Sequence, residues 1–177
     1  MNQENLWAPW RMAYLQDLDR RRDAADGRTD DDPAGFLARY WSQPEADGEN
    51  LVIARTEAGM VLLNRYPYAN GHLLVALGEP RPTLLDYDPA QRAAFWHLIE
   101  IAMDLMQRTI NPQGINVGIN QGAAAGAGVP HHLHGHLVPR WNADTNFITT
   151  VGAVRVIPDA LERMAAAYRQ THAESPE

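Results

Sequence analysis

The sequence predicts an α+β domain: one mainly antiparallel sheet with a long helix and a C-terminal helix on one side of it. Two observations carry this prediction. Short apolar segments bounded by turn residues recur after residue 50, as strands do. Two longer segments, 88–109 and 158–171, instead place apolar residues at helical spacing. Strands and helices in this mixture are typical of an α+β fold.

Five segments are predicted to be strands. The first three are short apolar runs separated by Gly, Pro and Asn, residues that favour turns. The fourth alternates apolar and polar residues, and the fifth carries histidine at every second position. The five segments are 51–54, 60–63, 72–77, 114–120 and 132–139.

The long helix is predicted to begin at Asp88 and Pro89, because aspartate is a good N-cap and proline suits the first helical position. It should end near Thr109 and bury an apolar stripe as ordinary core packing. This stripe comprises Trp96, Ile99, Met103, Met106 and Ile110. In the C-terminal helix, the residues predicted to face inward are Leu161, Met164, Ala165 and Tyr168.

The organisation of the chain is predicted to be an N-terminal extension, 1–49, followed by a domain over 50–177. The extension opens with an aromatic segment, 6–15, which we expect to pack on the domain or on a second subunit because it is costly to leave in water. A charged run with few apolar residues follows at 17–32. Such a run predicts a loop or a mobile segment.

Composition excludes several classes of protein. The 177 residues include no cysteine, which excludes disulfides, cysteine nucleophiles and thiolate metal ligands. The net charge of −7 argues against a protein that coats nucleic acid, but it leaves a small anionic ligand open. No apolar run is long enough to cross a bilayer, and the first residues lack the pattern of a signal peptide. We therefore expect a cytoplasmic protein with no nucleic acid or membrane partner.

The segment richest in chemistry carries three alternating histidines. In a strand, alternate side chains share a face, so His132, His134 and His136 are predicted to point the same way. Leu133 and Leu137 would then enter the core from the opposite face. Three imidazoles in a row are poor core residues because their nitrogens need partners. The row therefore predicts a functional site.

Two functional interpretations of this row compete, beside a purely structural histidine cluster. Histidines at alternate strand positions suit zinc, and a neutral imidazole oriented by its neighbours is a nucleophile. The preceding segment, 120–128, favours the nucleophile. Its sequence, Asn-Gln-Gly-Ala-Ala-Ala-Gly-Ala-Gly, can turn tightly and present bare backbone N–H groups to phosphate oxygens. A metal site gains nothing from such a loop.

The alternation of histidine and apolar residues over 132–138 resembles the signature of the histidine-triad family. Segment 63–75 resembles the first conserved block of the family. Segments 116–122 and 139–147, with the opening 6–12, are similar to a bacterial branch related to diadenosine tetraphosphate phosphorylases. The resemblance implies the histidine-triad fold. It also implies an enzyme that acts on the α-phosphate of a nucleoside phosphoramidate or dinucleoside polyphosphate, through a nucleotidyl-histidine intermediate. Hydrolysis, phosphorolysis with inorganic phosphate, non-catalytic nucleotide binding and metal-dependent hydrolysis stay open as alternatives.

The resemblance also implies a role for each site residue. His134 would be the nucleophile, His132 and His136 would orient it and contact phosphate, and His72 would complete the cluster from a neighbouring strand. The substrate-binding residues would be Asn64 at the ribose, Asn120 near the scissile phosphate, and the backbone of Gly126, Ala127 and Gly128 at phosphate oxygens. No metal or cofactor is implied. The partners would be a purine nucleotide and a second copy of the chain, in a homodimer or a higher homo-oligomer.

The sequence departs from the family pattern at two places. Gly135 stands where relatives usually carry a larger apolar residue, and glycine weakens a strand. The stretch 35–39 has no counterpart of the Cys-x-x-Cys zinc pair that many relatives in this branch carry. Two further residues stay ambiguous in the sequence. Trp141 suits base, dimer or packing contacts, and Arg140 could pair with Asp144 or reach phosphate.

Overall fold

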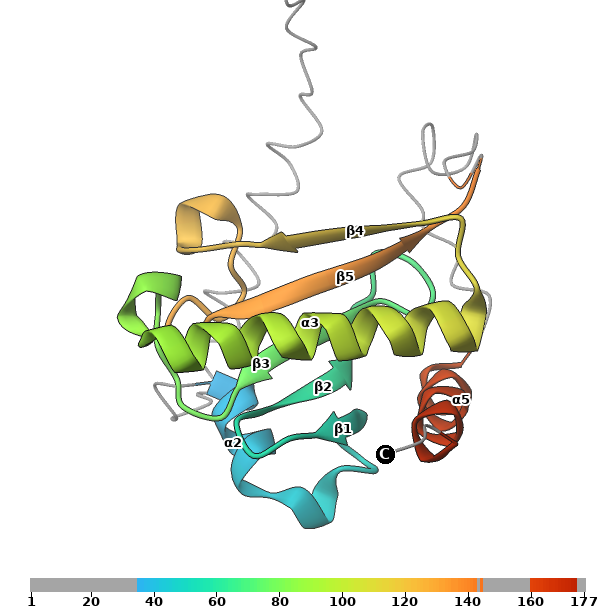
Figure 1. Cartoon of the computed structure of the whole chain (residues 1–177), viewed down its shortest axis with the longest axis horizontal. Coiled ribbons are helices and arrows are strands. Elements are labelled where there is room, and N and C mark those ends of the chain that lie inside the picture. The colour runs from blue at the N-terminus through green and yellow to red at the C-terminus, as the bar shows by residue number, and fades with distance from the viewer. Residues whose placement is uncertain (1–34, 143, 145–159, 175–177) are drawn as a thin grey trace, which may run out of the picture. The chain divides into compact units, whose positions relative to one another are not determined.

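The computed structural model describes residues 35–142, 144 and 160–174, and these residues form an α+β fold (Figure 1). Its five-stranded sheet has the order β1-β2-β3-β5-β4, and every neighbouring pair of strands is antiparallel. The strands are β1 (Val52–Arg55), β2 (Gly59–Leu63), β3 (Leu73–Leu77), β4 (Gly114–Ile119) and β5 (His134–Arg140). The predicted antiparallel sheet is confirmed.

Helices α3 (Pro89–Ile110) and α5 (Leu161–Ala173) pack on the same face of the sheet, as predicted (Figure 1). The start of α3 also agrees with the prediction. The Asp88 carboxylate accepts a hydrogen bond from the Gln91 backbone N–H, and the Gln91 side-chain oxygen accepts one from the Asp88 backbone N–H, which completes a capping box. The helix ends where Asn111 adopts a left-handed conformation, with φ 41°.

The buried face of α3 differs from the predicted stripe. Ile99 and Met106 are buried, but Trp96 is 48% exposed and Met103 is 40% exposed. The core side of the helix is centred instead on residues at i, i+3, i+7 and i+10, a spacing that keeps one helical face inward. These residues are Phe95, Leu98, Ala102 and Leu105. The predicted stripe runs along the border of this face, so part of it reaches solvent.

The opposite face of the sheet carries a short helix that the sequence analysis did not predict. Helix α2 (Gly35–Ser42) packs the fully buried Leu37 against side chains of β1, β2 and β3. A 3-10 turn, η1 (Pro44–Ala46), then leads to β1. The apolar residues of α2 follow helical spacing, at Phe36, Leu37, Tyr40 and Trp41. The proposed domain boundary at residue 49/50 stays a prediction.

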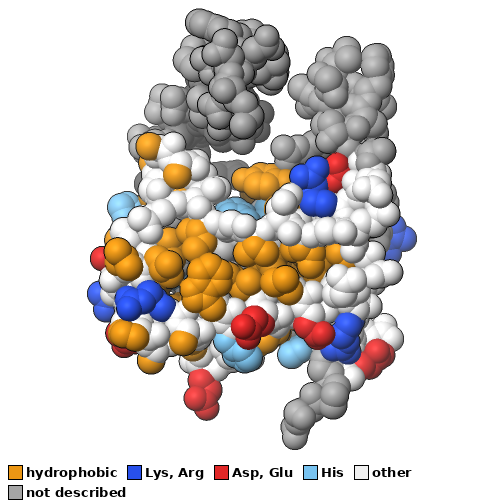
Figure 2. Space-filling model, turned by 45° about the horizontal axis from the view of Figure 1, so that its top comes forward, with side chains coloured by type: hydrophobic (Ala, Val, Ile, Leu, Met, Phe, Trp, Pro, Cys, Tyr) orange, Lys and Arg blue, Asp and Glu red, His pale blue; other side chains and the backbone are white. Residues whose placement is uncertain are grey.

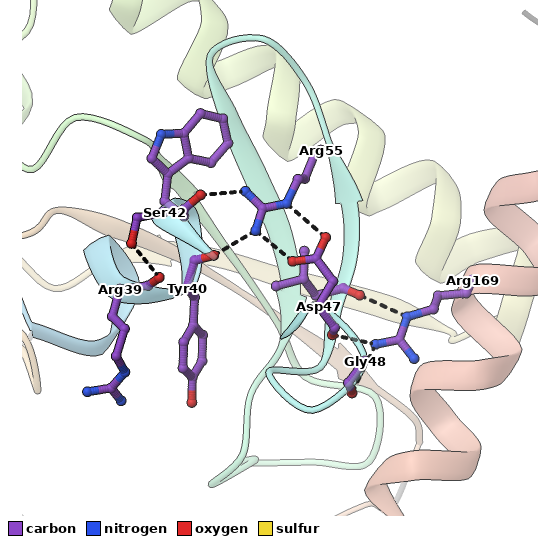
Figure 3. Close-up of polar contacts among 9 residues, drawn as sticks. Arg39, Tyr40, Ser42, Asp47, Gly48, Arg55 and Arg169 are labelled. Carbon is purple, nitrogen blue, oxygen red and sulfur yellow. Dashed lines mark hydrogen bonds and ion pairs between the residues drawn. The ribbon is translucent and has the colours of Figure 1, made fainter. Parts of the chain in front are cut away.

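Two arginines connect these elements (Figure 3). Arg55 of β1 donates to both carboxylate oxygens of Asp47, at 2.8 and 2.6 Å, and to the carbonyl oxygens of Tyr40 and Trp41 at the end of α2. These hydrogen bonds to the Asp47 carboxylate raise the pKa of Arg55 above its ordinary value. From α5, Arg169 donates to the Asp47 carbonyl at 3.0 Å and to that of the first residue of β1 at 2.8 Å. Helix α5 is therefore anchored to the η1–β1 segment.

Several sequence predictions concern residues outside the described ranges. They include the aromatic segment 6–15, the charged run 17–32, and positions 158 and 159, at the predicted start of the last helix. Within the described ranges, the inward residues of α5 are Met164, Ala165 and Tyr168, as predicted. No helix in these ranges combines the length and apolar character needed to cross a membrane.

Candidate active site

The candidate site lies on the sheet face opposite α3. In the register of β3 and β5, His134 lies opposite Ala76 and His136 opposite Leu74, and both of these partners belong to the cluster that packs under α2. Leu137, one position on, belongs to the core beneath α3. The alternation of the strand therefore places His134 and His136 on one face, as the sequence predicts.

The prediction that His132 extends this row within the strand is wrong. Strand β5 begins only at His134. Before it, the backbone of Leu133 donates to the carbonyl of Arg81 at 2.8 Å, which takes the chain out of the regular ladder. The side chain of His132 is fully buried, and its Nε2 lies 2.7 Å from the carbonyl oxygen of Leu77 at the end of β3. His132 thus binds the end of the neighbouring strand.

The tautomer of His134 follows from its hydrogen bond. Its Nδ1 lies 2.9 Å from the carbonyl oxygen of His132. A carbonyl only accepts, so Nδ1 carries the proton and the neutral ring has its lone pair on Nε2. Burial lowers the pKa of His134 below its ordinary value of 6.5, and the His132 carbonyl offsets this only in part. A neutral imidazole with a defined Nε2 lone pair is the form a nucleophile needs.

His72 and His136 form a second ordered pair. The backbone N–H of Tyr68 donates to His72 Nδ1 at 3.1 Å, so this nitrogen must be the acceptor and Nε2 must carry the proton. His72 Nε2 lies 3.1 Å from His136 Nδ1 and therefore donates to it. The His136 proton is then on Nε2. Burial lowers the pKa of His136 to about 4, with the neighbouring His134 as a second cause.

His136 Nε2 is the unpaired donor of the cluster. It is buried and has no hydrogen-bond partner among the described residues. Its ring centroid lies 5.0 Å from that of His134, beside the candidate nucleophile. Buried donors in native proteins have partners, and an unsatisfied donor in a site is ready for a ligand oxygen. The cluster therefore combines a lone pair on one ring with an N–H donor on the next.

Tyr68 is a site residue that the sequence analysis missed. Its ring stacks on that of His136, with centroids 5.8 Å apart and planes at 14°, and it also contacts the His72 ring at 4.7 Å. The side chain is 46% exposed, so it forms part of the surface over the cluster. The sequence feature that could have identified Tyr68 is its position in a turn segment, four residues before His72. Only the fold shows that its ring covers two imidazoles.

The loop before the histidines turns tightly, as predicted, but uses part of its backbone internally. Gly122 and Gly126 adopt φ of 83° and 88°, which favours glycine. The amides of Gly126 and Ala127 donate to carbonyls of Ala123 and Gly122, at 2.9 and 3.2 Å. These two amides are therefore not the bare donors that the sequence analysis expected. The amide of Gly128 makes no backbone hydrogen bond to another described residue.

The asparagines predicted to bind substrate have different environments. Asn64 follows β2, where its side-chain oxygen accepts from the Tyr66 amide at 2.9 Å and its Nδ2 lies 3.2 Å from His72 Nδ1. It thus holds the segment that leads to His72. Asn120 directly follows β4 and is half-buried. It lies one residue beyond the last register pair of β4 and β5, Ile119 with Gly135, on the side of His134.

Arg140 pairs with Asp144, one of the two arrangements that the sequence left open. Its Nη2 lies 2.8 Å from the Asp144 carboxylate and its Nη1 lies 3.0 Å from Asn116 Oδ1. The hydrogen bonds with Asp144 raise the pKa of Arg140. The adjacent Trp141 is half-buried. Among the described residues, no three His, Asp or Glu side chains are grouped so that they could hold a metal ion.

The lowered histidine pKa values predict a pH-dependent stability. In the folded protein the pKa of His136 is about 4 and that of His134 is below 6.5, whereas in the unfolded chain both rings take up protons near 6.5. Between these values the unfolded state binds more protons, so the free energy of unfolding should fall as pH falls through this window. Urea unfolding at about pH 7.5 and about pH 5 measures this loss. The variant His136→Asn should lose less stability, and an unchanged slope in this variant would contradict the assignment.

The sequence of this chain is similar to those of known proteins that belong to one family. The family model described as HIT domain matches residues 44–143. The chain is 35% identical to AP-4-A phosphorylase of Mycobacterium tuberculosis over 158 residues, 89% of this chain and 78% of that protein. It is 30% identical to a bis(5'-nucleosyl)-tetraphosphatase (asymmetrical) of Schizosaccharomyces pombe over 93 residues, 52% of this chain and 50% of that protein.

A solved structure shares the fold. A zinc-bound histidine triad family protein from Mycobacterium smegmatis matches with a TM-score of 0.62 and 26% identity, over 76% of this chain and 92% of that chain. The family-model match includes β1 to β5, with the paired histidines of β5. The chain belongs to the histidine-triad (HIT) domain family.

Proposed function

We propose that the protein is a nucleotide hydrolase or nucleotidyltransferase that acts on a dinucleoside polyphosphate or a nucleoside phosphoramidate. The observation that supports this most directly is the tautomer of His134, which leaves a lone pair on Nε2 in a buried, neutral ring. Such a nitrogen is a competent nucleophile toward phosphorus. The substrate is a purine nucleotide, and a cytoplasmic location remains our prediction from the sequence.

The reaction proceeds in two displacements. First, His134 Nε2 attacks the α-phosphorus. A P–N bond forms, and the bond from phosphorus to the leaving group breaks. The His136 Nε2–H donates to an oxygen that gains charge, either on the phosphoryl group or on the leaving group. Second, inorganic phosphate, or water that loses a proton to the solvent, attacks the same phosphorus and the P–N bond breaks, which restores the neutral His134. Dividing one difficult displacement into two easier ones is the gain of covalent catalysis.

The relatives favour inorganic phosphate as the acceptor. The similarity to AP-4-A phosphorylase extends over 89% of this chain, whereas that to the tetraphosphatase extends over 52%. We therefore rank diadenosine tetraphosphate phosphorolysis first and hydrolysis second. Non-catalytic nucleotide binding is the third alternative, in which the ordered histidines would serve only as ligands.

Product analysis tests this proposal. Purified protein is incubated with diadenosine tetraphosphate in a chelator, with and without inorganic phosphate. Phosphorolysis is expected to give ADP and ATP only when phosphate is present. AMP and ATP without phosphate would instead identify a hydrolase. If neither this substrate nor adenosine phosphoramidate is converted while nucleotide still binds, the catalytic proposal is wrong and the binding alternative takes its place.

We further propose that the chain forms a homodimer through β4 and α3. Strand β4 is the last strand in the order of the described sheet, and an edge strand can pair with another chain. Its Val117 is 40% exposed, and α3 adds the exposed side chains of Trp96 and Met103. Figure 2 shows apolar side chains gathered on the face of the molecule that carries α3 and β4. A contiguous apolar surface of this kind favours association.

The homodimer can be tested by charging this surface. The double variant Trp96→Lys/Met103→Lys is expected to shift the protein from dimer to monomer in sedimentation equilibrium, because two lysine ammonium groups resist burial. The variant Tyr66→Lys is the control. Tyr66 is 82% exposed and lies in the β2–β3 connection, so its replacement should leave the dimer intact. A wild-type protein that is monomeric at all concentrations would contradict the proposal.

A further inference from the structure

Helix α5 sends one polar group into the core, the hydroxyl of Tyr168. The side chain is fully buried, and its hydroxyl donates to the carbonyl oxygen of Gly71 at 2.9 Å. Burial raises the pKa of this phenol well above its ordinary value, so the hydroxyl stays a donor over the working range of pH. A phenylalanine at position 168 would be sufficient for hydrophobic packing alone. The hydroxyl thus has a specific partner, on a segment 97 residues away in sequence.

Gly71 is held closely at the point where Tyr168 reaches it. Its φ is 83°, a conformation that favours glycine. A Cβ built on Gly71 would lie 2.7 Å from Ile110 Cδ1 of α3 and 2.9 Å from the Tyr168 hydroxyl oxygen. The backbone here therefore lies directly against both helices. The peptide group that joins Gly71 to His72 is therefore held at both ends: its carbonyl accepts from Tyr168, and its N–H donates to the Ala69 carbonyl at 3.1 Å.

The orientation of that peptide group sets the ring of His72. On the other side of the residue, the His72 carbonyl accepts from the Asn64 backbone N–H at 2.9 Å. The ring is fully buried and its Nδ1 accepts from the Tyr68 N–H, so small rotations of the backbone move Nε2 directly. Nε2 must reach His136 Nδ1, 3.1 Å away, to keep the His136 proton on Nε2.

Helix α5 is itself fixed independently of this contact. Arg169 binds the Asp47 carbonyl, as Figure 3 shows, and Thr171 Oγ1 lies 2.9 Å from Thr109 Oγ1 on α3. The position of the Tyr168 hydroxyl is therefore fixed by contacts of α5 other than its own hydrogen bond. We propose that Tyr168 is a positioning residue, whose hydroxyl orients His72 and, through it, the His136 donor. This inference rests on the proposed function of the histidine cluster.

The variant Tyr168→Phe tests this inference, because it removes one oxygen and keeps the ring. We expect kcat for diadenosine tetraphosphate to fall about tenfold with KM nearly unchanged, since misplaced groups cost rate when they act on the transition state. The second readout needs no turnover. The ring ¹⁵N resonances of His72 and His136 in the folded variant should show mixed tautomers, where the wild type shows the Nε2–H form of each.

Tyr87→Phe is the matched control. Tyr87 is 1% exposed and its hydroxyl donates to the Glu79 carbonyl at 2.7 Å, so this variant also loses one buried hydrogen bond to a backbone carbonyl. It should lose similar stability and keep kcat. Equal kcat in the two variants, with unchanged His72 and His136 resonances in Tyr168→Phe, would overturn the inference. A wild type without turnover would instead refute the proposed function, and the resonances would still decide the role of Tyr168.

Discussion

The variant His134→Ala is expected to lose at least about 10³-fold in kcat/KM for diadenosine tetraphosphate, because removal of a nucleophile ends the covalent route. The His132 carbonyl orients the imidazole and burial keeps it neutral, so its Nε2 lone pair is available at neutral pH. Alanine supplies no lone pair. The nucleotide should still bind, because its other contacts are retained.

Steady-state kinetics and a labelled intermediate together check this expectation. Label that is stable in base and released by acid, as expected of a P–N bond, should appear on the wild-type protein after brief incubation with radiolabelled substrate and be missing from His134→Ala. His97→Ala is the control, because His97 is an exposed histidine of α3 that pairs with Glu100. If His134→Ala retains activity within about tenfold of the wild type, direct attack by the acceptor replaces the covalent mechanism.

The variant Gly135→Val is expected to lower the free energy of unfolding by about 2–3 kcal/mol, the range typical of an overpacked core. Gly135 faces α3 from β5, the strand that carries His134 and His136. A Cβ there would lie 2.9 Å from Val75 Cγ2 and 3.2 Å from Phe95 Cζ. The Phe95 ring thus occupies space that a larger residue at 135 would need. This accounts for the departure from the family pattern, because Val75 of β3 and Phe95 of α3 together fill the space that a side chain at 135 would take.

Chemical denaturation measures this loss, and two further variants locate its cause. Gly118 lies beside His136 on the neighbouring strand β4, and a Cβ on it would meet no atom within 4 Å. Gly118→Ala should therefore change stability little. The double variant Gly135→Val/Phe95→Leu should recover part of the loss, because the two sites share one space. Additive effects of the two substitutions would contradict this explanation.

The sequence by itself determined the local features of this protein. Alternation in β5 was enough to place His134 and His136 on one face, because the side-chain period of a strand is two. Asp88 before α3 and Pro89 at its first position predicted where the helix begins, because capping depends on neighbouring residues only. The family signature and the antiparallel sheet were also predictable, because each depends on short, regular patterns in the local sequence.

The tertiary structure decided what depends on distant residues. His132 lies outside the strand because the backbone N–H of Leu133 donates to the Arg81 carbonyl. The His132 ring hydrogen-bonds to the carbonyl of Leu77, 55 residues away. The tautomers of the cluster depend on which atoms meet across strands, such as His72 and His136. The contact of Tyr168 with Gly71 joins residues 97 positions apart in the chain. No local pattern encodes such contacts, because they form only when the whole core packs.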